Sequence, residues 1–262
     1  NQYKVDDEWL DLERRLAPLE IRFWRNFRWT VNREVLYSIY GPAMRVDDEV
    51  FAIRYAGIGE FRQIEQWYRM GRAQSLEQFK DAMRIQALAM FNTGYGDRDG
   101  NIFYAYNALL PERAAGHDWR GTVPGNTRDT LWTEYRPFDE LPIVENPESG
   151  FIQNCNSDPF QTSIGEDNPD ESGFPENYGI EKWMTNRARR AVELYGSDES
   201  ITHDEFFRYK YDKLYSEKSN LRRQVTDFVE AQAGNSVLKK EIDLLRQWNG
   251  ETTKDNRSTA LV

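Results

Sequence analysis

Residues 150–159 have the sequence GFIQNCNSDP. The pattern predicts a buried strand over residues 151–160 that ends in a polar elbow, Asn154 to Pro159. An asparagine side chain offers a neutral amide donor that needs no titration. Such a donor can hold a developing oxyanion, at a benefit of about 3 kcal/mol. An asparagine-rich turn without chemistry is the competing interpretation, because asparagine favours turns.

The sequence before the elbow predicts both helices and strands. Residues 59–92 have a helical pattern, and Ser75 followed by Gln78 forms a capping-box signal inside it. A turn at residues 97–100 precedes a predicted strand over 101–110. Residues 111–150 are rich in proline and glycine and form a long connection. Long ordered loops of this kind are usually functional or tightly packed.

The two ends of the chain have different patterns. Residues 5–20 show apolar side chains near helical spacing, so we predict a helix there, although Pro18 interrupts it. Residues 21–56 alternate between apolar and polar, which predicts two or three strands interrupted at Gly41-Pro42. Residues 179–249 are helical throughout, with a capping box at Thr202 and Glu205. The predicted fold class is therefore α+β with a largely helical C-terminal half.

Composition excludes several classes of protein. The 34 lysines and arginines against 44 aspartates and glutamates give a net charge of −10. Binding to nucleic acid or to anionic lipid needs a basic face, so we predict neither partner. The 8 tryptophans, 14 tyrosines and 14 phenylalanines indicate a folded chain rather than a disordered one. No segment approaches the roughly 20 apolar residues of a membrane helix.

Cysteine and histidine are scarce. Cys155 is the single cysteine, which excludes an internal disulfide and zinc sites built on several thiolates. It could act as a nucleophile with His117 or His203 as the base. A lone cysteine is more often a small buried hydrophobe, and that interpretation is favoured here.

Two further patterns have ordinary explanations. Residues 97–101 superficially suggest a calcium loop, but an EF-hand needs a glutamate at the twelfth position and Ala108 stands there. A tight turn is therefore expected. Arg187, Arg189 and Arg190 lie on a helix with charges of both signs, and taken alone they indicate a solvated, ion-paired face.

A series of short motifs between residues 97 and 160 is specific in its order and spacing. The motifs are Asp99-Gly100-Asn101-Ile102, Leu110-Pro111-Glu112-Arg113, Gly116-His117-Asp118-Trp119, Val123-Pro124-Gly125, Trp132, Pro137-Phe138-Asp139-Glu140-Leu141-Pro142, Asn146-Pro147 and Gly150-Phe151-Ile152-Gln153-Asn154-Cys155-Asn156. Together they resemble the penicillin-acylase family of N-terminal-nucleophile hydrolases. Weaker likeness extends the resemblance over roughly residues 20–262, and it is strongest to the branch of acyl-homoserine-lactone and aculeacin-type acylases.

The resemblance implies a parent with a four-layer αββα core that cleaves its own precursor. The new N-terminal residue of the β-chain, usually a serine, would attack an amide and release its acyl group. The amide substrate would be a small molecule such as a β-lactam with an acyl side chain or an N-acyl-homoserine lactone. The other partners would be the α-chain and the rest of the β-chain, and the location would be periplasmic or secreted.

The resemblance also implies roles for two residues. Asn156, the second asparagine of the elbow, falls on the family's oxyanion-hole asparagine. Arg187 is the best match for an arginine that holds the polar network of the site, with Arg189 and Arg190 as alternatives. No cofactor is required. The family allows a structural calcium ion in the parent, for which Asp167 or the Trp119 carbonyl are unassigned candidates.

The N-terminal residue departs from the family pattern. Asn1 is not serine, threonine or cysteine. We therefore expect an internal segment of a β-chain, with mixed strands and helices over 1–178 and helices over 179–262. Such a chain would be inactive alone, because the nucleophile would lie outside it. The alternative is a binding or structural module that has lost catalysis, since a fold does not prove a function.

Overall fold

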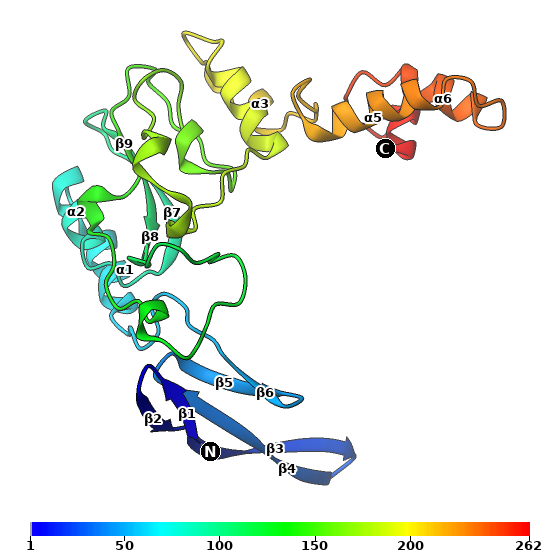
Figure 1. Ribbon diagram of the computed structural model, residues 1–262. Helices are drawn as coiled ribbons and strands as arrows, with labels where there is room; N and C mark the ends of the chain where they lie inside the picture. Colours follow the sequence, from blue (N-terminus) through cyan, green and yellow to red (C-terminus); the bar gives the residue numbers. More distant parts are fainter. Residues whose placement is uncertain (1) are drawn as a thin grey trace. The chain divides into compact units, whose positions relative to one another are not determined.

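A computed structural model describes residues 2–262 of the chain (Figure 1), so the prediction about Asn1 lies outside the described residues. Helices account for 29% and strands for 24%, which confirms the predicted α+β class. The chain divides into two compact units, each built from separate stretches of sequence. Unit 1 comprises residues 1–91, 107–141 and 172–180; unit 2 comprises residues 92–106, 142–171 and 181–262.

The N-terminal part of unit 1 consists of antiparallel strands. A hairpin of β1 (Gln2–Val5) and β2 (Glu8–Asp11) precedes a sheet of β3 (Glu13–Trp24), β4 (Phe27–Ser38), β5 (Gly41–Val46) and β6 (Glu49–Ala52), paired in chain order. The strand character predicted over 21–56 is thereby confirmed. The predicted interruption is misplaced, because Gly41 and Pro42 already pair with Ser38 and Tyr37 at the start of β5 and the turn lies before them.

The helix predicted over residues 5–20 is wrong, because β2 and β3 occupy most of that segment. Leu16 and Leu19 are 56% and 49% exposed, so their spacing does not mark a buried helical face. The long strand β4 pairs with β3 along almost its whole length, and Arg14 Nε donates to Glu34 Oε1 across the two strands at 2.6 Å. Strand pairing therefore overrides a weak helical pattern that Pro18 already interrupts.

Two short helices form the core of unit 1. These are α1 (Gln63–Arg72) and α2 (Leu76–Met83), and Ser75 caps α2 by accepting from Gln78 N, as predicted. The fully buried Gln66 accepts from the backbone of Ala87 and Leu88 at 2.7 and 3.0 Å. The long connection adds the 3-10 turns η1 (Arg128–Thr130), η2 (Phe138–Glu140) and η5 (Glu176–Tyr178).

Most of the strands β7 (Met90–Gly96) and β8 (Ile102–Ala108) belong to unit 2, where they form a sheet with β9 (Ile143–Glu145) in the order β7-β8-β9 (Figure 1). The turn between β7 and β8 is the predicted tight turn. Asp97 Oδ1 accepts from the backbone of Asp99 and Asn101 at 3.0 and 2.9 Å, so this carboxylate is engaged in the turn.

The remainder of unit 2 is mostly helical. It contains η3 (Pro159–Gln161), α3 (Asn186–Tyr195), α4 (His203–Lys210), α5 (Asn220–Ala231), α6 (Lys239–Arg246) and η6 (Arg257–Leu261); a further 3-10 turn, η4, spans Glu171–Gly173. The capping box at Thr202 and Glu205 is confirmed at the start of α4. No helix among residues 2–262 is both long and apolar enough to span a membrane.

The strand predicted over residues 151–160 is also wrong. This segment is irregular until η3, and the short strand β9 takes the place beside β8. Its backbone is held in other ways: Gln153 N donates to Thr162 O at 2.7 Å, and Asp158 N donates to Trp183 O at 3.1 Å. The apolar start of the segment marks burial, which a loop held by such contacts also provides.

Candidate functional site

The polar elbow lies in unit 2 and turns sharply at Asn156. The backbone of this residue has φ = 57°, in the left-handed region that asparagine tolerates better than most residues. Asn156 N donates to Asn154 Oδ1 at 3.2 Å, which closes a turn across Cys155. The side chain of Asn156 is thereby presented to solvent.

Arg187 contacts this elbow directly. Its Nη2 donates to Asn156 Oδ1 at 3.0 Å and to the Cys155 carbonyl at 3.1 Å. A guanidinium can only donate, so the amide oxygen of Asn156 must face it. The amide nitrogen Nδ2 consequently points away, and it makes no hydrogen bond with the described part of the chain. The structure thus brings together the two residues that the sequence singled out.

The start of α3 positions Arg187. Thr185 caps the helix by accepting from Ala188 N at 3.1 Å, and the same hydroxyl donates to the Cys155 carbonyl at 3.2 Å. The sequence prediction placed the start of this helix near Gly179, which is wrong: α3 begins at Asn186. Arg187 therefore lies in the first turn of α3, next to the elbow.

The alternative arginines do not make this contact. Arg190 pairs with Asp212 at 2.8 Å and with Glu193 at 2.7 Å, so its guanidinium is engaged within the helical region. The guanidinium of Arg189 makes no hydrogen bond or ion pair within residues 2–262, although its backbone N–H donates to Thr185 O at 3.0 Å. Arg187 is accordingly the arginine of this helix that can organise the elbow.

Sequence reasoning missed a ring of hydrogen bonds behind the elbow. Tyr104 donates to Asn92 Oδ1 at 3.1 Å, Asn92 Nδ2 donates to Asn154 Oδ1 at 3.2 Å, and Asn154 Nδ2 returns to the Tyr104 hydroxyl at 3.4 Å. Tyr104 is buried, and burial raises the pKa of its hydroxyl, which therefore stays neutral. Both Oδ1 and Nδ2 of Asn154 therefore make hydrogen bonds, whereas Nδ2 of Asn156 makes none with the described residues.

Burial acts on the two acidic side chains of the elbow, Cys155 and Asp158. Burial raises the pKa of the Cys155 thiol, and this effect exceeds the opposing influence of the Arg187 charge. A nucleophilic cysteine needs a lowered pKa, so the cysteine alternative is disfavoured. Burial also raises the pKa of Asp158, whose Oδ1 accepts from Phe160 N at 3.0 Å.

No three histidine, cysteine, aspartate or glutamate side chains gather into a metal site anywhere in residues 2–262. Asp167 Oδ2, one of the calcium candidates, accepts from Glu148 N at 2.9 Å. The calcium candidates therefore stay unassigned.

A comparison with known protein families identifies the chain. The sequence profile of the family described as penicillin amidase matches residues 1–262. The chain belongs to the penicillin amidase family. The resemblance drawn from the motifs around the elbow is thereby confirmed.

The chain is similar to two curated acylases and to one acylase of known structure. It is 29% identical over 161 residues to penicillin G acylase of Escherichia coli, covering 60% of this chain and 18% of that protein. It is 24% identical over 257 residues to the acyl-homoserine lactone acylase PvdQ of Pseudomonas syringae, covering 89% and 31%. A thermostable penicillin G acylase from Alcaligenes faecalis shares the fold with a TM-score of 0.69 at 21% identity, covering 97% and 44%. The segment thus spans less than half the length of each of these relatives.

Proposed function

We propose that a longer polypeptide containing this segment is an acylase that removes an acyl group from a small amide. Membership of the penicillin amidase family and relatives named as acylases support this proposal. The structural observation that carries it is the amide of Asn156, whose oxygen is held by Arg187 while its nitrogen keeps a free donor. The substrate would be a β-lactam with an acyl side chain or an N-acyl-homoserine lactone.

In this proposal the elbow provides part of the oxyanion hole. An N-terminal nucleophile outside these 262 residues attacks the amide carbonyl, and negative charge develops on the carbonyl oxygen. Asn156 Nδ2 donates to that oxygen. The positively charged Arg187 donates to Asn156 Oδ1. This hydrogen bond polarises the Asn156 amide and makes its Nδ2 a stronger donor, as in other hydrogen-bond chains. A fixed donor of this kind acts mainly on the transition state, because the ground-state carbonyl carries little charge.

The proposal includes a partner and a location. The remainder of an acylase precursor would complete the site, in keeping with the partial coverage of the relatives. The location would be the periplasm or the outside of the cell, an expectation that rests on the family resemblance alone. Fractionation of cells that express the longer polypeptide tests it.

Turnover of a chromogenic acyl amide tests the function. We expect the longer polypeptide to hydrolyse it and the 262-residue chain to be inactive, since loss of a nucleophile and its base costs about a millionfold. Saturable binding of the amide by the longer polypeptide without any hydrolysis would favour the non-catalytic module instead. Hydrolysis by the 262-residue chain at a comparable rate would contradict the placement of the nucleophile.

A further inference from the structure

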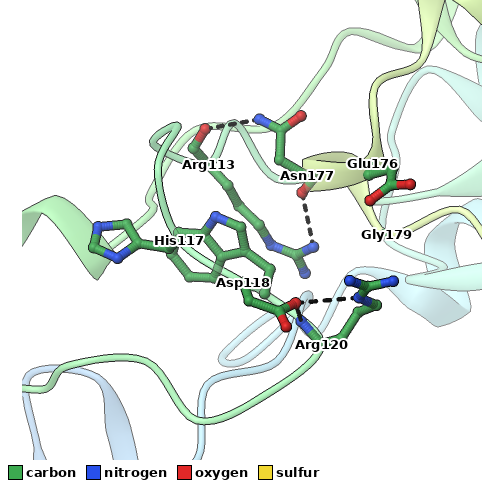
Figure 2. Close-up of a pocket in the computed structure, with 8 residues that line it drawn as sticks. Arg113, His117, Asp118, Arg120, Glu176, Asn177 and Gly179 are labelled. Atoms are coloured by element: carbon green, nitrogen blue, oxygen red, sulfur yellow. Dashed lines mark hydrogen bonds and ion pairs between the residues drawn. The ribbon is translucent and has the colours of Figure 1, made fainter.

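A pocket of ≈ 300 Å³ in unit 1 lies around the guanidinium of Arg113 (Figure 2). It is formed by the loop that contains His117, Trp119 and Arg120 and by the turn at residues 176–179. The two segments are tied together, because Asn177 Nδ2 donates to the Arg113 carbonyl at 3.0 Å. No residue of the elbow lines this pocket.

The guanidinium is fixed in this pocket by contacts that carry no opposite charge. Its Nη1 donates to the Asn177 carbonyl at 2.9 Å, and its central carbon lies 5.5 Å from the ring centre of Trp119 and 5.8 Å from that of Trp132. Gly179 makes room for it: a Cβ at this position, which has φ = 74°, would lie 2.8 Å from Nη1. Holding a flexible side chain in this way prepares it for a ligand.

Arg113 lacks the partner that a half-buried cation usually has. It forms no ion pair within residues 2–262, and its buried Nε makes no hydrogen bond there. Burial lowers the pKa of Arg113, which shows that no carboxylate compensates for the lost water. Arg136, in the same unit, also lies over aromatic rings but pairs with Glu140 at 3.3 Å. A desolvated charge without a partner is costly, so the free donors favour an anion.

The carboxylates around the pocket do not fill this role. Asp118 accepts from Arg120 Nε and from Arg120 N, both at 3.1 Å, and Figure 2 shows this pair beside the Arg113 guanidinium. Glu176 also lines the pocket, but it is exposed to solvent, so its charge is screened. One cation therefore remains without a partner.

We propose that the Arg113 pocket binds a carboxylate. A carboxylate can accept from the accessible Nη2 of this charged group, and the neighbouring indole of Trp119 offers a flat apolar surface for the body of the ligand. A dianion would need two unpaired cations to balance its charge, and Arg113 is the single unpaired cation among the residues that line the pocket. The carboxylate comes from a small free acid or from a side chain elsewhere in the longer polypeptide; the chemistry of recognition is the same.

Calorimetry with sodium benzoate, at constant ionic strength, tests the site. We expect saturable binding to wild-type protein and none with benzamide, the neutral analogue. Arg113→Gln should weaken benzoate binding at least about tenfold, because it removes a charge-assisted pair. Arg120→Gln, in the same pocket, is the matched control and should leave the affinity within about threefold. Equal losses in the two variants would overturn the assignment to Arg113.

Two further measurements distinguish the sources of the carboxylate. Benzoate binding to both the longer polypeptide and the 262-residue chain indicates a free acid. A crystal structure of the longer polypeptide then shows benzoate oxygens at Arg113. If the same structure instead shows a protein carboxylate there and benzoate does not bind, the source is the polypeptide itself. Water alone beside Arg113 Nη2 in benzoate-soaked crystals, together with no benzoate binding, would overturn the proposal.

Discussion

The elbow and the Arg113 pocket use an arginine in opposite ways. At the elbow, the exposed Arg187 is occupied by the oxygen of Asn156, and the group left free is a neutral amide. In the pocket, the half-buried Arg113 guanidinium donates only to the backbone carbonyl of Asn177. Its charge is therefore left without an anionic partner. A neutral donor binds weakly to a ground-state carbonyl and more strongly to an oxyanion, whereas a free cation binds a stable anion throughout. The first arrangement suits catalysis and the second suits retention of a ligand.

Removal of the neutral donor should have the largest effect. In the longer polypeptide, Asn156→Ala should lower kcat about 100- to 1,000-fold with little change in KM, because the donor acts mainly in the transition state. Steady-state kinetics with a chromogenic amide measures this. Asn154→Ala is the matched control. The Asn154 amide is engaged in the ring with Asn92 and Tyr104, so this substitution should lower the free energy of unfolding rather than act on kcat directly. Equal kcat losses at unchanged stability would remove the distinction between the two asparagines.

The guanidinium behind the donor should have a smaller effect. Arg187→Lys keeps the charge but loses the planar fork that reaches both Asn156 and the Cys155 carbonyl. We expect kcat to fall about tenfold, a loss of about 1.4 kcal/mol of transition-state stabilisation. Arg189→Lys, on the same helix without such a contact, should be almost silent. If both variants behave alike, Arg187 does not position the donor.

These residues show which parts of the site the sequence could predict. The family resemblance suggests Asn156 through the order of the motifs around it, and Arg187 through its spacing to the helix start at Thr202. The structure shows that the two residues are in contact, and their roles stay predictions. The ring of Asn92, Tyr104 and Asn154 joins residues up to 62 positions apart. Its formation depends on which strands pair and on where the irregular segment then lies, and no local pattern contains that information.

The same limit applies to the fold. The alternation in residues 27–38 predicts the strand β4 correctly, yet its partner β3 has a helical spacing and becomes a strand through pairing. In contrast, the helix starts at Ser75 and Thr202 depend on contacts within three residues, and both are predicted correctly. Thr185 is a cap of the same kind, but Ala188 rather than glutamate or glutamine stands three residues later. No capping-box signal therefore marks the start of α3, and the prediction misplaces it.

The hydroxyl of Tyr104 should affect stability more than chemistry. Tyr104→Phe removes the hydrogen bonds to Asn92 Oδ1 and from Asn154 Nδ2, which should lower the free energy of unfolding by about 0.5–1.5 kcal/mol. Denaturant unfolding measures this loss. Tyr106→Phe is the control on the same strand, because that hydroxyl makes no hydrogen bond within residues 2–262. A loss as large for Tyr106→Phe would show that the ring is not the cause.

The smallest expected effect is a change in pH dependence at the end of the elbow. Burial raises the pKa of Asp158 in the folded chain, so ionisation opposes folding. Below the pKa of Asp158 in the unfolded chain, which is about 4, the side chain is protonated and its contribution to stability is fully present. This contribution is lost as the pH rises through the higher pKa of Asp158 in the folded chain. Asp158→Asn keeps an oxygen that can accept from Phe160 N but cannot ionise. Its free energy of unfolding should match the wild type near pH 3 and exceed it at neutral pH. A difference in the free energy of unfolding between Asp158→Asn and the wild type that stays constant with pH would mean that Asp158 is not desolvated in the elbow.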